Sequence, residues 1–150
     1  MATTHKWVAP EALTSYFTTE LNTLADSTSD TTGFSAVGAE IANETDLYQY
    51  INMELVVNTQ GAARSAGGFV AVYINYSADG TTYDDTSNKA FSELLAVFPL
   101  DAATTARRLT KTNVPIPPID FKMLVLNDTG QALAATGNTL KYRRHNEQDV

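Results

Sequence analysis

Residues 46–57, DLYQYINMELVV, alternate between apolar and polar side chains and carry the clearest fold signal in the sequence. One parity is apolar and contains Leu47, Ile51, Met53, Leu55 and Val57. The other parity is polar or amphipathic and contains Asp46, Tyr48, Tyr50, Asn52 and Glu54. A period of two is typical of a β-strand with one face in the core and the other in solvent. We therefore predict a half-buried strand here.

Further strands are predicted on the C-terminal side of this segment, separated by turns such as SADG at 77–80. They cover residues 67–76, 94–100, 107–114, 121–127 and 139–143. The prolines of PIPP at 115–118 remove ladder donors, so we expect a sheet edge or a crossover between sheets there. Short strands with turns between them and no βαβ alternation predict an antiparallel β-sandwich, jelly-roll-like in its connections.

On the N-terminal side, residues 10–25 show helical periodicity instead. Leu13, Phe17, Leu21 and Leu24 recur at spacings of about four, four and three, which places them on one stripe of a helix. Pro10 suits a first helical position. The whole chain is thus predicted to be mainly β: a single β-sandwich domain over 1–150, with one N-terminal amphipathic helix at about 10–25 that covers an open sheet face, and extended terminal segments.

Composition narrows the class of protein. The chain has 150 residues, 43% of them hydrophobic, and a formal net charge of -7, which suits one soluble domain and disfavours a nucleic-acid partner. Neither an apolar run of about 18 residues nor a signal-peptide pattern is present, so we expect no membrane partner. The absence of cysteine excludes disulfides and thiolate chemistry and suits a reducing cytoplasm.

Catalytic and metal-binding patterns are also missing from the sequence. His5 and His145 lie at opposite ends without a further ligand pattern, and no G-x-S-x-G elbow occurs. Asp79, Asp84 and Asp85 offer oxygen ligands for calcium, but a solvated hairpin loop explains them better. We therefore expect no enzyme activity, no cofactor and no metal.

The chain ends carry the candidate contact residues. Residues 1–60 hold one base against eight acids, a net of -7, whereas residues 102–150 hold seven bases against four acids, a net of +3. On the last predicted strand, Lys141 and Arg143 face outward if Leu140 and Tyr142 face the core. Arg144 then begins a polar tail, and the acidic first sixty residues of the same or a neighbouring copy are possible partners for these bases. Solvated ion pairs are the simpler alternative.

Aromatic residues supply further candidates. Trp7 lies among polar residues near the N-terminus and is expected to be exposed, as a contact hot spot would be. Tyr48, Tyr50 and Asn52 share the polar parity of their strand, a row of side chains that suits an interface or a sugar platform. Packing of these tyrosines inside the domain is the alternative.

Four blocks of the sequence resemble a known family: LTSYFTTELNTLA at 13–25, NETDLYQYINMELVV at 43–57, VYINYSADGTTYDD at 72–85, and residues 98–148 from FPLDAATT to RRHNEQ. With them the chain resembles the small capsid decoration, or cement, proteins of tailed bacteriophages. The resemblance implies a non-enzymatic β-sandwich on the outer surface of the virion capsid, made in the bacterial host cytoplasm. Its implied partners are the major capsid protein, whose neighbouring copies it bridges, and itself, as a homodimer or homotrimer.

On this reading, the predicted capsid or subunit contacts are Trp7, Tyr48, Tyr50, Lys141, Tyr142, Arg143 and Arg144. The rival hypothesis is a jelly-roll carbohydrate- or receptor-binding module of a phage particle, which would use Tyr48, Tyr50 or the Asp79–Asp85 loop.

Overall fold

The fold is known from a computed structural model that describes residues 5–27, 36–85 and 89–149. Within these ranges the regular elements are β1 (His5–Trp7), β2 (Thr14–Phe17), β3 (Ala36–Ile41), β4 (Tyr50–Val57), β5 (Phe69–Ser77), the 3₁₀ turn η1 (Lys89–Phe91), β6 (Glu93–Pro99), β7 (Arg107–Pro115), β8 (Asp120–Asp128), β9 (Thr139–His145) and β10 (Glu147–Asp149). The described part of the chain contains no helix with the length and apolarity needed to span a membrane.

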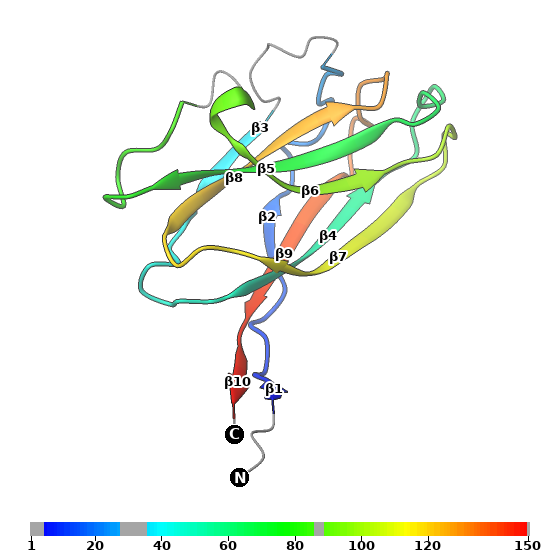
Figure 1. The fold of residues 1–150 in the computed structure, drawn as a ribbon. Coiled ribbons are helices and arrows are strands. Elements are labelled where there is room, and N and C mark those ends of the chain that lie inside the picture. Colours follow the sequence, from blue (N-terminus) through cyan, green and yellow to red (C-terminus); the bar gives the residue numbers. More distant parts are fainter. Residues whose placement is uncertain (1–4, 28–35, 86–88, 150) are drawn as a thin grey trace.

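Eight of the strands form two packed antiparallel sheets, in the orders β2-β9-β4-β7 and β3-β8-β5-β6 (Figure 1). The pairings are nested: β5 pairs with β6, β4 with β7, β3 with β8 and β2 with β9. The domain is thus one long hairpin, rolled up so that alternate pairs lie in opposite sheets, which is the arrangement of a jelly roll. The predicted β-sandwich is confirmed. So is the crossover at PIPP, because β7 ends at Pro115 on a sheet edge and β8 begins in the other sheet.

The core lies between the sheets, and β4 follows the predicted alternation. Ile51, Met53, Leu55 and Val57 are buried, and the residues between them are half-buried. They face residues of the second sheet that are also buried, among them Val72, Ile74, Phe121, Met123 and Val125. The strand begins at Tyr50 rather than at Asp46. Before it the chain turns, and Leu47 is exposed with a positive φ of 55°.

The predicted amphipathic helix at about 10–25 is wrong. Residues 14–17 form strand β2, which pairs with β9, and turns follow up to Thr23, whose φ is 57°. Phe17, Leu21 and Leu24 still reach the core, but they reach it from a strand and its following turns, and Leu13 is 48% exposed. The segment contains four threonines, whose branched side chains favour a strand, and pairing with β9 supplies the backbone hydrogen bonds that a helix would have made internally.

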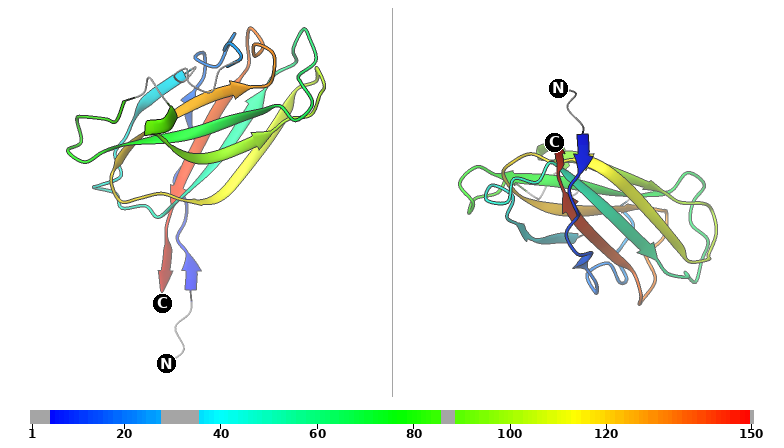
Figure 2. Two further views of the ribbon diagram at one scale, coloured as in Figure 1. Left: turned by 45° about the horizontal axis from the view of Figure 1, so that its top comes forward. Right: turned by 90° about the horizontal axis from the view of Figure 1, so that it is seen from below.

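Beyond the body of the sandwich, the nested hairpin continues for one more pair. β1 pairs with β10, with His5 opposite Asp149 and Trp7 opposite Glu147. These two short strands extend the β2–β9 pair away from the domain and carry both chain ends, as Figure 1 and both views of Figure 2 show. We call this two-stranded ribbon, His5–Trp7 with Glu147–Asp149, the stalk.

Candidate functional site

The stalk is joined to the body by backbone hydrogen bonds and has two open edges. The Val8 N–H donates to the Asn146 carbonyl at 2.9 Å, and the Glu11 N–H donates to the Arg144 carbonyl at 3.0 Å. No third strand of the described chain pairs with β1 or β10. A two-stranded ribbon without a packed face is marginally stable in water, and open edges are templates for another strand. The stalk is therefore an element that a partner chain can complete.

An aromatic cluster forms the root of the stalk, where it meets the body. The Trp7 ring makes edge-to-face contacts with Tyr50, at 5.6 Å between centroids, and with His145, at 5.2 Å. Tyr50 stacks on His145 at 5.6 Å. His145 is only 4% exposed, whereas Trp7 is 56% exposed. The cluster therefore fixes the position of the indole while leaving much of its surface open.

A ring of hydrogen bonds holds His145 in place. Its Nε2 lies 3.1 Å from Asn113 Oδ1, and its Nδ1 lies 3.4 Å from Asn52 Nδ2. The Asn113 N–H closes the ring by donating to Asn52 Oδ1 at 2.8 Å. With the amides so oriented, the neutral imidazole carries its proton on Nε2. Burial, and then the nearby charge of Arg143, lower the pKa of His145, so the same neutral form is favoured electrostatically.

The ring depends on an irregularity in the sheet. The register of β4 against β7 shifts between Ile51 and Met53, which leaves extra residues of β7 opposite Asn52. Asn113 lies in this bulge with φ at 56°, a left-handed conformation that asparagine tolerates better than most residues. The bulge bends the edge strand and turns the Asn113 amide toward His145.

Two adjoining hollows lie on the outer face of this sheet, and we call them together the groove. One, of about 210 Å³, is lined by residues that include Leu13, Asn52, Glu54, Thr112 and Arg143. The other, of about 190 Å³, is lined by residues that include Trp7, Pro10, Asn52, Asn113 and His145. Asn52 lines both, so the two hollows lie side by side, one at the stalk root and one over β4.

The sequence suggested that Arg144 begins a polar tail, but the structure places it inside strand β9. Its side chain is 9% exposed, and it donates to Glu11 Oε2 at 2.8 Å and to Asp46 Oδ2 at 2.9 Å. A third hydrogen bond goes to the Ala42 carbonyl at 2.7 Å, and the Tyr48 ring lies 4.6 Å from the guanidinium. Arg144 pairs in register with the buried Ile51. It therefore faces inward, and acidic residues of its own chain neutralise it.

The seven predicted contact residues separate into two groups. Tyr48, Tyr142 and Arg144 pack against the core or its rim. Trp7 and Tyr50 lie at the stalk root, and Arg143 and Lys141 lie on the outer face of the same sheet, each opposite a residue of β4. Arg143 lies opposite Asn52, and Lys141 opposite Glu54. The structure thus brings Trp7, Tyr50 and Arg143 to one surface.

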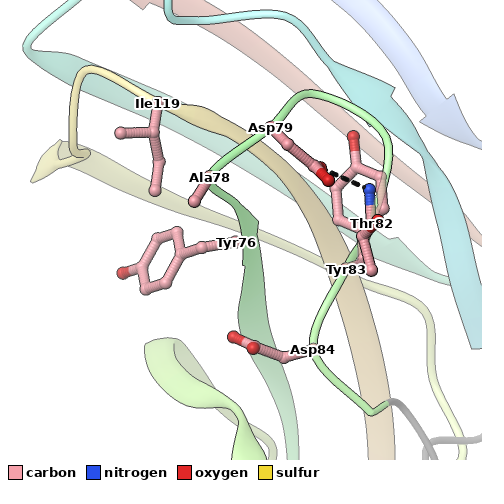
Figure 3. A pocket seen from close by; sticks show the side chains of 7 residues that line it. All are labelled: Tyr76, Ala78, Asp79, Thr82, Tyr83, Asp84 and Ile119. Carbon is pink, nitrogen blue, oxygen red and sulfur yellow. Dashed lines mark hydrogen bonds between the residues drawn. The ribbon is translucent and has the colours of Figure 1, made fainter.

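In the Asp79–Asp85 loop, hydrogen bonds from neighbouring residues satisfy the Asp79 carboxylate. The Asp79 carboxylate accepts from the Thr82 N–H at 2.6 Å, as Figure 3 shows. It also accepts from the Thr81 N–H at 2.9 Å and from the Ser77 hydroxyl at 3.1 Å. These bonds, led by the one from Thr82, hold the pKa of Asp79 well below its usual range. A hollow of about 380 Å³ lies beside the loop, with Tyr76 and Asp84 among its lining residues. In the described ranges, no three His, Cys, Asp or Glu side chains gather as metal ligands would.

Comparison with known proteins adds one structural likeness. No protein-family model matches the chain, and no curated protein matches it. A chain in the structure of infectious bursal disease virus, Gx strain, superposes with a TM-score of 0.41 at 15% identity. The match covers 97% of this chain and 32% of that one, so this chain spans about a third of the length of the viral chain.

The sequence placed Asn52 on the polar parity with Tyr48 and Tyr50, but it did not indicate Asn113, and it placed His145 in the polar tail. The sequence did contain a signal for Arg144 and His145, because the alternation of β9 continues through both residues. Arg144 follows Leu140 and Tyr142 on the inward face, and His145 follows Arg143 on the outward face. The contribution of Asn113 depends on the bulge, which has no signature in the sequence around it.

Proposed function

We propose that this protein is a non-catalytic structural protein of a virion, a decoration or cement protein on the outside of a tailed-phage head. It bridges neighbouring copies of the major capsid protein. The sequence resemblance supplies the family, and the jelly roll is compatible with it, since this architecture recurs in viral capsid proteins and in lectins. Fold alone does not decide function. The observation that carries the proposal is the stalk.

The stalk contributes little to the body and is built to be completed by another chain. β1 and β10 bury no core residue among those described, and each presents one open edge. An extended segment of a capsid subunit added to such an edge gains main-chain hydrogen bonds, and side chains that point to alternate faces supply specificity. Docking by strand addition therefore explains why the hairpin continues after the sandwich is complete.

Repetition around a shell supplies the stability that one short ribbon cannot. The protein acts as a dimer or trimer, so that several stalks engage neighbouring capsid subunits together. Linked weak contacts raise the overall affinity by about 10²–10⁴ without any new contact. The body then lies outside the shell, as expected for a protein made in the bacterial cytoplasm and added to the head surface.

The test is removal of the stalk. A chain that lacks residues 1–7 and 147–150 is mixed with undecorated heads, and the bound copies per head are counted by cryo-electron microscopy. We expect occupancy to be lost while the melting temperature of the free protein falls by no more than about 2–4 °C, the equivalent of about 1 kcal/mol in a domain of this size. The matched control is Asp84→Lys in the exposed loop at the far side of the second sheet, which should dock normally. Full occupancy without the stalk would refute the proposal.

A further inference from the structure

The groove beside the stalk root combines an open indole with polar groups that have no partner. We propose that this groove binds an acidic glycan, with one sugar ring against Trp7 and its anionic group at Arg143. The glycan site uses the outer sheet face and the Trp7 ring at the stalk root, whereas capsid docking uses the backbone edges of the stalk.

The spacing of the groove fits one sugar residue. Arg143 and His145 are successive outward positions of β9, so they lie about 7 Å apart along the strand. Trp7 covers His145, and Asn52 lies opposite Arg143 on the neighbouring strand. A ring that rests on the indole therefore places a substituent within reach of the guanidinium. The two hollows, of about 210 and 190 Å³, together lie near the lower end of the range for ligand-binding clefts, about 300–1,000 Å³.

Unused hydrogen-bond donors dominate the groove. Trp7 Nε1, Asn113 Nδ2 and the Arg143 guanidinium have no hydrogen-bond acceptor in the described ranges. Arg143 is exposed, and no carboxylate of the described residues forms an ion pair with it. Arginine binds a carboxylate through two parallel hydrogen bonds. This excess of donors predicts a ligand that is rich in acceptors and carries negative charge.

Glu54 adds a second constraint on the ligand. Its Oε1 is buried and lies 3.3 Å from Arg108 Nη2 as an ion pair, so that oxygen is not open to a ligand. The residue still lines the groove, and its charge repels dense negative charge such as that of a sulfate or phosphate chain. A sugar with one anionic group places its charge at Arg143 and its neutral hydroxyls near Glu54.

The site is already ordered before it binds. The Asn52–His145–Asn113 hydrogen bonds fix the amide of Asn113, and contacts with Tyr50 and His145 fix the indole. Binding therefore orders few side chains, which reduces its entropic cost.

The experiment uses the single tryptophan of the chain, Trp7, as its reporter. The full protein is titrated with short oligomers of galacturonic acid and of sialic acid, and the fluorescence is followed. Neutral galactose oligomers and oligoglutamate serve as probes of the same length without charge and without a sugar. We expect a saturable change with at least one acidic oligomer. Binding should be weaker by about tenfold or more, about 1.4 kcal/mol, with the galactose oligomers because they lack the charged contact, and with oligoglutamate because it lacks the ring that rests on Trp7.

Two variants locate the site. Arg143→Gln should weaken binding of the acidic oligomer by about tenfold or more, and Trp7→Ala, followed by calorimetry, should do the same. Lys141→Gln is the matched control, because it removes the same charge from the same strand outside the groove. Absence of saturable binding, equal binding of oligoglutamate, or equal loss in Lys141→Gln would overturn the proposal. Glycan binding is measured on the free protein and docking on heads, so failure of one proposal leaves the other testable.

Discussion

The β2–β9 pair and the β1–β10 pair are successive parts of the same antiparallel ribbon, yet they are stabilised differently. In the body, Phe17 is 1% exposed and Leu140 is fully buried, and the opposing sheet covers both. In the stalk no described side chain is buried, and Trp7 at its root is 56% exposed. The same pairing thus continues past the point where burial supports it. A ribbon kept without a core is better explained by a partner than by the stability of the domain.

The largest change in the free energy of unfolding is expected on truncation of Phe17, in the β2–β9 pair of the body. Phe17→Ala leaves a cavity in the core and should lower the free energy of unfolding by about 3–5 kcal/mol, measured by urea denaturation of the free protein. Leu13→Ala, four residues earlier on the same predicted stripe but exposed, should cost less than about 1 kcal/mol. Equal costs for both variants would mean that residues 10–25 pack differently from the strand and turns described above.

A smaller effect is expected at the junction of the body and the stalk, where Arg144 ties β9 to Glu11 and Asp46. Arg144→Met removes this ion pair and should lower the free energy of unfolding by about 2 kcal/mol, less than for a fully buried pair because both carboxylates are partly exposed. Denaturation of the variant beside Arg143→Met, an exposed neighbour on the same strand, measures it. If Arg143→Met were the more costly change, the inward orientation of Arg144 would be wrong.

The smallest effect concerns pH at the stalk root. Because the pKa of His145 is lowered in the fold, its neutral form contributes stability that is fully present above the unfolded pKa of about 6.5. That contribution is lost as the pH falls from about 6.5 through the lowered pKa. Unfolding free energies at about pH 7.5 and about pH 5 measure it. The dependence should persist in His5→Gln and shrink in His145→Gln. An unchanged dependence in His145→Gln would assign it to other groups.

The sequence predicts the body of this protein much better than its site. The alternation in residues 46–57 depends on burial of one sheet face, so it correctly indicates the sandwich and the inward set Ile51, Met53, Leu55 and Val57. The stripe of Leu13, Phe17, Leu21 and Leu24 correctly marks three core residues but assigns them to a helix. Spacing alone cannot show that residues 14–17 find a partner in β9, more than a hundred positions away in the chain.

Prediction of the site from the sequence fails for a related reason. Its members come from β4, from the bulge in β7 and from β9, and they meet through the Asn52–His145–Asn113 hydrogen bonds. A register shift places Asn113, and register shifts depend on pairing between distant strands. Exposure of Trp7 was predicted correctly, because a lone aromatic residue among polar neighbours lies outside any alternating strand pattern.

Hydrogen exchange of the stalk amides tests the central claim most directly. In the free protein, amides of β1 and β10 should exchange rapidly, while those of β2 and β9 beside Phe17 and Leu140 should be protected, since burial supports only the second pair. On decorated heads, the stalk amides should become protected to the level of the body, and the amides of the Asp79–Asp85 loop should not change. Stalk amides that are equally protected in the free protein, or that remain unprotected on the particle, would contradict the account.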